Sequence, residues 1–125
     1  MREIKFRGKR IGTKEWLYGY FYINDKGKNM IHNPNAIPRH FRVIPETVGA
    51  YTGLKDKNGA EIYEGDILRN GERGRKRYEV VWLDGCLYAK RKESSNTTRY
   101  HIIGNKEYIV IGNIHENPEL MEVQS

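Results

Sequence analysis

The sequence has little cysteine, little proline and no long apolar run. Its 125 residues include four prolines and one cysteine, Cys86, which excludes an internal disulfide framework and a cysteine-based zinc cluster. No apolar stretch approaches the roughly 18 residues that cross a bilayer, and the N-terminus has no signal-like apolar segment. We therefore expect a soluble, cytoplasmic protein with no membrane partner.

Recognisable catalytic and metal-binding motifs are also absent. There is no glycine-rich phosphate-binding loop, and the four histidines are scattered without a metal-ligand spacing. Two carboxylates, Glu64 and Asp66, flank the turn glycine Gly65, but a hydrogen bond from the local backbone to Asp66 explains this pattern better than a cation site does. We predict a non-enzymatic protein with no catalytic residues, no metal site and no cofactor.

The positive charge is concentrated in one segment. The formal net charge is +6, and residues 69–92 alone hold eight basic and three acidic residues. A loop with this composition beside a basic strand could follow a nucleic-acid backbone, with Tyr78, Tyr88 or Tyr100 as stacking faces. A solvated, solubilising loop is the alternative. The candidate nucleic-acid residues are Arg69, Arg73, Arg75, Lys76, Arg77, Lys90, Arg91 and Lys92.

Aromatic residues are concentrated in residues 16–23, whose sequence WLYGYFYI is typical of a β-strand. Side chains alternate across a strand, so every second residue from position 16 should share one face. That face could pack in the core, form an interface between copies of the chain, or stack on bases. The residues on it are Trp16, Tyr18, Tyr20 and Tyr22.

The remaining pattern predicts a mainly β fold made of short strands separated by glycine turns. Asn58-Gly59 predicts a type I′ hairpin turn. We expect residues 1–50 to form a β-hairpin region with an irregular connection. Residues 51–125 should form a small SH3-like barrel with a short C-terminal helix, and the two parts should make one compact unit. The acidic C-terminal tail should either dock on the basic body through its glutamates or remain free.

Three motifs follow one another along the chain: residues 1–7 with 16–19, residues 51–59 with 61–67, and residues 110–120. Together they resemble the YopX family of phage and prophage proteins. One departure is Gly8-Lys9-Arg10, where many members have Ala-Trp and an acidic or polar residue. The resemblance implies a β-rich, phage-encoded protein in the cytoplasm of a bacterial host, and it implies no known activity and no catalytic residues.

Two functions follow as expectations. The first is a non-enzymatic accessory protein that associates with itself and acts by binding, with the aromatic strand face as its interface. The second is a nucleic-acid-binding module that uses the basic segment 69–92.

Overall fold

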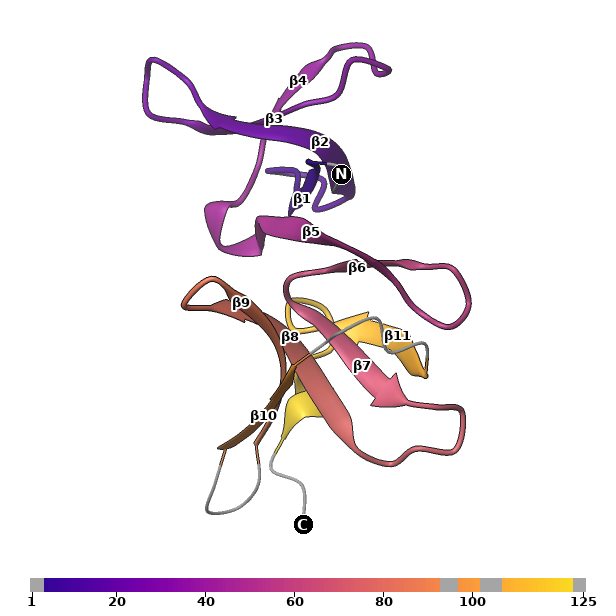
Figure 1. The fold of residues 1–125 in the computed structure, drawn as a ribbon. Helices are drawn as coiled ribbons and strands as arrows, with labels where there is room; N and C mark the ends of the chain where they lie inside the picture. Colours follow the sequence, from indigo (N-terminus) through magenta and orange to yellow (C-terminus); the bar gives the residue numbers. More distant parts are fainter. Residues whose placement is uncertain (1–3, 93–96, 102–106, 123–125) are drawn as a thin grey trace. The chain divides into compact units, whose positions relative to one another are not determined.

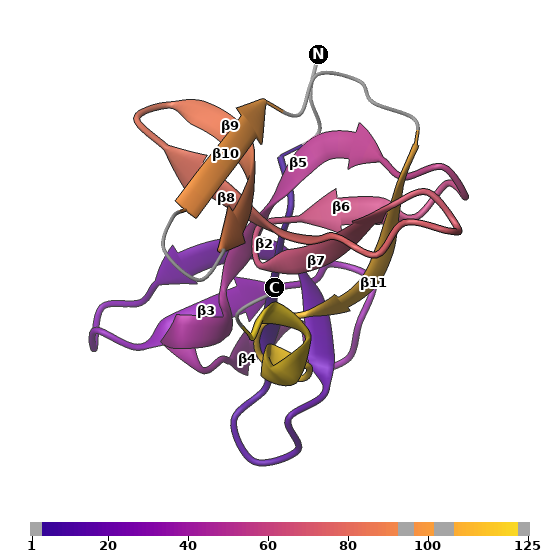
Figure 2. The ribbon, with the colours of Figure 1, turned by 90° about the horizontal axis from the view of Figure 1, so that it is seen from below.

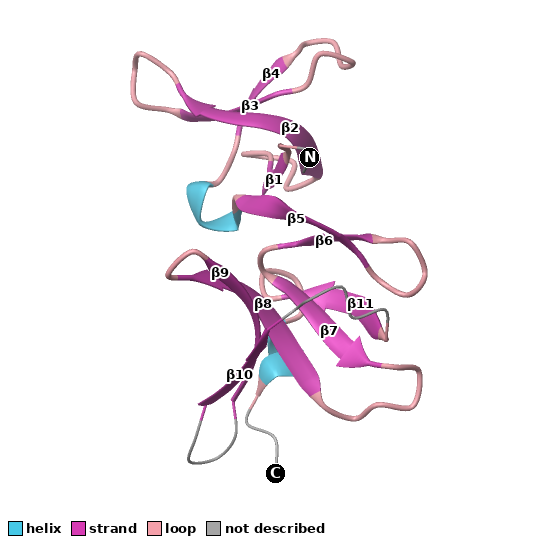
Figure 3. Cartoon of the chain, in the orientation of Figure 1, coloured by secondary structure: helices cyan, strands magenta, loops and turns pink. Residues whose placement is uncertain are grey.

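The computed structural model describes residues 4–92, 97–101 and 107–122. The chain divides into two compact units, Met1–Tyr51 and Thr52–Ser125 (Figure 1). Strand β5 (Gly49–Lys55) begins in the first unit and ends in the second. Strands and loops make up nearly all of the described chain (Figure 3), which confirms the prediction of a mainly β protein.

The first unit is an antiparallel sheet in the order β4-β3-β2-β1-β5. One face of this sheet carries the core, in which Ile31, Phe41 and Val43 are buried. Gly8 permits close packing there, since a Cβ at this position would lie 3.2 Å from both Ile31 and Val43. A 3-10 turn, η1 (Pro45–Thr47), precedes β5. The other strands are β1 (Phe6–Lys9), β2 (Trp16–Ile23), β3 (Asn29–His32) and β4 (His40–Arg42).

The second unit contains a hairpin and a five-stranded antiparallel sheet. In the hairpin, β6 (Glu61–Tyr63) lies beside β5. The sheet has the order β10-β9-β8-β7-β11, and Figure 2 shows it from a second side. Its core cluster contains Ile62, Leu68, Tyr78, Val80, Ala89 and Tyr108. The sheet strands are β7 (Asp66–Asn70), β8 (Arg77–Leu83), β9 (Cys86–Lys92), β10 (Thr97–His101) and β11 (Tyr108–Asn113).

The turn at Asn58-Gly59 differs from the expected type. A type I′ turn needs a positive φ at both central residues, but only Gly59 has one, at 85°. The side chain of Asp56 explains the wider loop, because its Oδ1 accepts hydrogen bonds from the amides of Asn58 and Ala60, both at 2.8 Å. A turn with both residues at positive φ occurs at Asp84-Gly85, between the paired residues Leu83 and Cys86.

Two further expectations about the second unit are wrong. The described strands do not close into a barrel, because β10 and β11 are the opposite edges of an open sheet. The C-terminal helix is only a 3-10 turn, η2 (Pro118–Met121), which packs against β8. A short α-helix does not sustain itself in water without packing against the rest of the protein. Asn113 instead holds this segment, since its Oδ1 accepts the amides of His115 and Glu116.

Candidate functional site

The predicted aromatic face lies on β2, opposite the core of the first unit. Phe21 points to the core side and contacts Phe6 at 5.9 Å between ring centroids. On the other face, Tyr18 and Tyr20 are 42% and 54% exposed, whereas Trp16 and Tyr22 are half-buried. The strand and its alternation are therefore as predicted. Two of the four rings, those of Tyr18 and Tyr20, are exposed at the surface.

Basic side chains from β1 flank the aromatic face at Trp16. Lys9 lies opposite Trp16 in the β1–β2 register, and Arg7 lies opposite Tyr18. The guanidinium of Arg7 is 4.5 Å from the Trp16 ring centroid, and the ammonium of Lys9 is 5.4 Å from it. These cation–π contacts fix the indole against the sheet. Trp16 thus contributes mainly to the first unit itself, and the tyrosines are the accessible part of the face.

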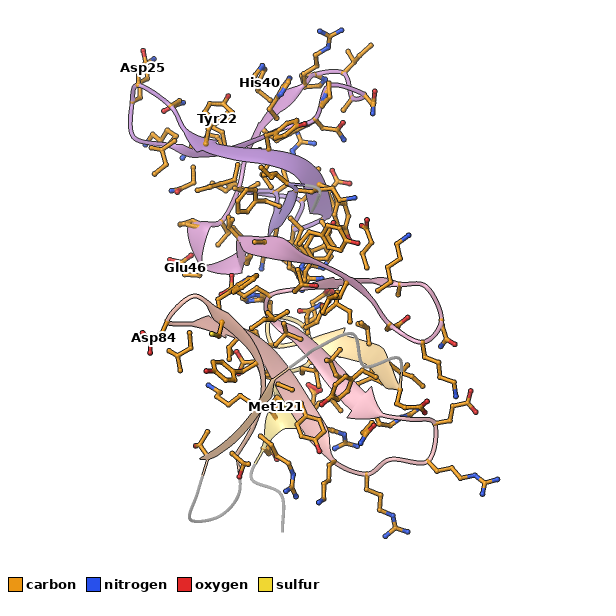
Figure 4. All side chains as sticks on the ribbon, in the orientation of Figure 1. Tyr22, Asp25, His40, Glu46, Asp84 and Met121 are labelled. Carbon is orange, nitrogen blue, oxygen red and sulfur yellow. The ribbon has the colours of Figure 1, made fainter. Side chains whose placement is uncertain are left out.

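Two histidines extend the aromatic face across β3 and β4. Tyr20 lies opposite His32, and His32 lies opposite His40, so the three side chains share one face. The two imidazole rings stack at 4.6 Å and 23°, and Tyr20 stacks on His32 at 6.4 Å. The hydroxyl of Tyr22 is 2.7 Å from His40 Nδ1. In Figure 4, Tyr22 and His40 are labelled and lie on the same side of this sheet.

This histidine pair was not expected from the sequence, in which the four histidines are scattered. The pairing depends on the register of a hairpin whose loop, residues 33–39, has no clear period. A signal was present, because His32 and His40 flank that loop symmetrically. Two strands that pair on either side of a loop place such flanking residues opposite each other.

A hollow of about 330 Å³ adjoins Tyr18 and Tyr20. It is lined by the two tyrosines together with Gly19, Lys5 and residues 33–35 of the turn after β3. Ile4, 69% exposed, adds apolar surface at the same place. The lining residues are Ile4, Lys5, Tyr18, Gly19, Tyr20, Asn33, Pro34 and Asn35.

The basic segment separates into exposed and engaged side chains. Arg73, Arg75 and Lys76 are exposed in the loop between β7 and β8. The turn of this loop is tight, since a Cβ on Gly74 would meet the carbonyl group of Asn70. A hollow of about 360 Å³ lies here, lined by Asn70, Gly74, Arg75, Lys76 and Tyr78.

Other members of the predicted nucleic-acid set have partners in the protein. Arg69 donates from Nε to the carbonyl of Gly71 at 2.9 Å and so supports the loop. Lys90 is 3.7 Å from Glu79 on the neighbouring strand β8. Arg77 and Arg91 are half-buried. Lys92 belongs to β9, but its side chain lies outside the described residues, as does that of Tyr100.

The aromatic stacking faces expected beside the basic segment are only partly available. Tyr78 is buried and packs edge-on against Tyr108 at 5.8 Å between ring centroids. The expectation that it offers a stacking face is therefore wrong. Tyr88 is half-buried on β9.

The carboxylate turn at Glu64 and Asp66 has the structural role that was expected. Asp66 is buried, and its Oδ2 accepts the amide of Tyr63 at 2.7 Å. In the part of the chain that the structure describes, no three His, Cys, Asp or Glu side chains gather as a metal-binding group. The described helical segments include none with the length and apolar character of a membrane span.

These features define an antiparallel all-β protein with an exposed aromatic sheet face and a basic loop. The sequence profile of the YopX protein family matches residues 5–122, so the chain belongs to the YopX family. The crystal structure of protein EF1440 from Enterococcus faecalis is similar, with a TM-score of 0.57 and 25% sequence identity. That similarity covers 98% of this chain and all of EF1440. A comparison with curated proteins finds no match.

Proposed function

We propose that this protein is a non-enzymatic phage or prophage accessory protein, cytoplasmic in its bacterial host, that associates with itself through the aromatic face of β2. The observation that carries the proposal is the exposure of Tyr18 and Tyr20 on a sheet face whose reverse side packs the core. Family membership supports the phage context.

The chemistry of the face suits a protein partner. Tyrosine buries a large ring area while its hydroxyl still finds hydrogen-bond partners, so it is enriched at interfaces. Ile4 and the hollow beside Tyr18 and Tyr20 add apolar area and shape to the same patch. A second copy presents the same rings and the same hollow, as a self-complementary two-fold contact requires.

A matched pair of substitutions on β2 tests this proposal. Tyr20→Glu places a charge on the aromatic face, whereas Ile23→Glu places one at a residue that is 62% exposed and alternates to the opposite face. We expect Tyr20→Glu to lower the sedimentation mass to that of one chain and Ile23→Glu to leave it unchanged, with both folds intact by circular dichroism. Equal masses for Tyr20→Glu and the unaltered protein would contradict the proposed interface.

A second candidate function is nucleic-acid binding by the loop between β7 and β8. Arg73, Arg75 and Lys76 are exposed together there, and two of them line a hollow large enough for a phosphate group. Cations arranged in this way contact the phosphate backbone and give binding that weakens steeply with salt. The aromatic face remains the stronger basis, because neighbouring cations on a solvated loop are common in small proteins.

A further inference from the structure

The stacked pair of imidazoles on the aromatic face has the chemistry of a metal ligand set. His32 and His40 lie directly opposite each other on β3 and β4, with ring centroids 4.6 Å apart. Imidazole nitrogen suits zinc, nickel and copper ions. We propose that His32 and His40 together bind one divalent transition-metal ion, with the open coordination positions filled by water.

The two rings are close enough to share an ion once they leave the stacked arrangement. Two nitrogens bound at about 2.1 Å in tetrahedral geometry lie about 3.4 Å apart. Because the stacked ring planes are only 23° apart, their in-plane lone pairs do not converge on one point, and both imidazoles must rotate about their side-chain bonds to share an ion. His40 is exposed, so its ring has room to rotate while Nδ1 stays near the Tyr22 hydroxyl, and the half-buried His32 ring rotates toward it.

Tyr22 supplies the supporting contact that imidazole ligands usually have. Metal-bound histidines generally donate their second ring N–H to an oxygen, which fixes the tautomer and the ring orientation. The Tyr22 hydroxyl is 2.7 Å from His40 Nδ1. When Nδ1–H donates to this oxygen, the lone pair of His40 lies on Nε2, which is the atom left for the ion.

The neighbouring charge predicts which change strengthens binding. Arg42 lies two residues from His40 on the same face of β4. Its positive charge opposes a bound cation. Replacement of Arg42 by Gln should therefore tighten binding, whereas loss of either imidazole should weaken it.

Zinc titration of the untagged full chain by isothermal calorimetry tests the proposal. We expect one Zn²⁺ per chain and at least a tenfold loss of affinity in His32→Gln and in His40→Gln. Tyr22→Phe should lower the zinc affinity about tenfold, which is the lower end of the range for such supporting contacts. His115→Gln, which removes an imidazole from the second unit, is the matched control and should bind as the unaltered protein does.

Side-chain ¹⁵N spectra of the histidines provide a measurement that needs no variant. We expect zinc to shift the ring nitrogens of His32 and His40 and to leave those of His115 in place. Binding that is equal in all variants, absent altogether, or lost only in His115→Gln would overturn the proposal. Because calorimetry reads zinc and sedimentation reads mass, failure of this site is distinguishable from failure of the proposed self-association.

Discussion

Strand β2 of the first unit and the core cluster of the second unit use tyrosine in opposite ways. In the second unit, Tyr63, Tyr78 and Tyr108 are buried, and the latter two contact each other inside the core cluster. In the first unit, Tyr18 and Tyr20 stand on the surface, and aliphatic residues and phenylalanines form the core on the reverse face. The comparison shows that aromatic content alone does not reveal a binding surface. The face on which the rings stand decides whether they stabilise the fold or remain available to a partner.

The largest expected effect comes from removal of a ring from each unit. Tyr78→Ala should lower the free energy of unfolding by about 3–5 kcal/mol, since it leaves a cavity in the core of the second unit. Tyr20→Ala should change it by less than about 1 kcal/mol, because that ring is already half in water. Urea denaturation followed by circular dichroism measures both. Equal losses for the two variants would break the comparison between the units.

A smaller difference in stability is expected between two loops, one in each unit, that are each held by a single side chain. Asp56 Oδ1 accepts two amides of its own loop, as Asn24 Oδ1 does in the loop between β2 and β3. Asp56 is also buried, and its Oδ2 accepts the amide of Val110 on β11 at 2.9 Å.

We therefore expect Asp56→Ala to lower the free energy of unfolding by about 3 kcal/mol and Asn24→Ala to lower it by about 1 kcal/mol. Urea midpoints of the two variants, compared at equal slope, give the difference. Equal losses of stability in Asn24→Ala and Asp56→Ala would show that the hydrogen bond from Val110 on β11 to Asp56 does not stabilise the protein.

The smallest effect on stability concerns the basic loop. Changing Arg73, Arg75 and Lys76 together to Glu should alter the free energy of unfolding by less than about 1 kcal/mol, because all three are exposed. Any affinity for single- or double-stranded nucleic acid at low salt should be lost. Lys90→Glu is the control, since Lys90 is paired with Glu79. Fluorescence anisotropy across a salt series measures the affinity, and no binding by the unaltered chain would exclude this function.

Local patterns in the sequence were sufficient to predict the strands that carry the aromatic face. The alternation in residues 16–23 predicted β2 with its observed bounds, and two of the four residues expected on its aromatic face, Tyr18 and Tyr20, are exposed. Asp66 was likewise identified as a turn residue from its place beside Gly65, and its bond to Tyr63 confirms this. At these positions a few neighbouring residues determine the structure, so the local sequence was sufficient to predict it.

The errors arose at one turn, where a neighbouring side chain competes with the turn signal, and at places where residues distant in the sequence decide the structure. Asn58-Gly59 and Asp84-Gly85 both suit a type I′ turn, and the side chain of Asp56 selects the wider loop at the first of them. The open edges at β10 and β11 depend on strand order, which short-range patterns do not specify. The histidine pair was missed for the same reason, because only the β3–β4 register places His32 against His40.

The mass of the nuclease-treated full chain in solution, measured by light scattering, tests self-association most directly. Nuclease treatment removes any mass that bound nucleic acid would add. A mass that is a multiple of 14.7 kDa, and that falls to a single chain in Tyr20→Glu, is the result predicted for association through the aromatic face. A uniform species of 14.7 kDa at all concentrations would contradict it.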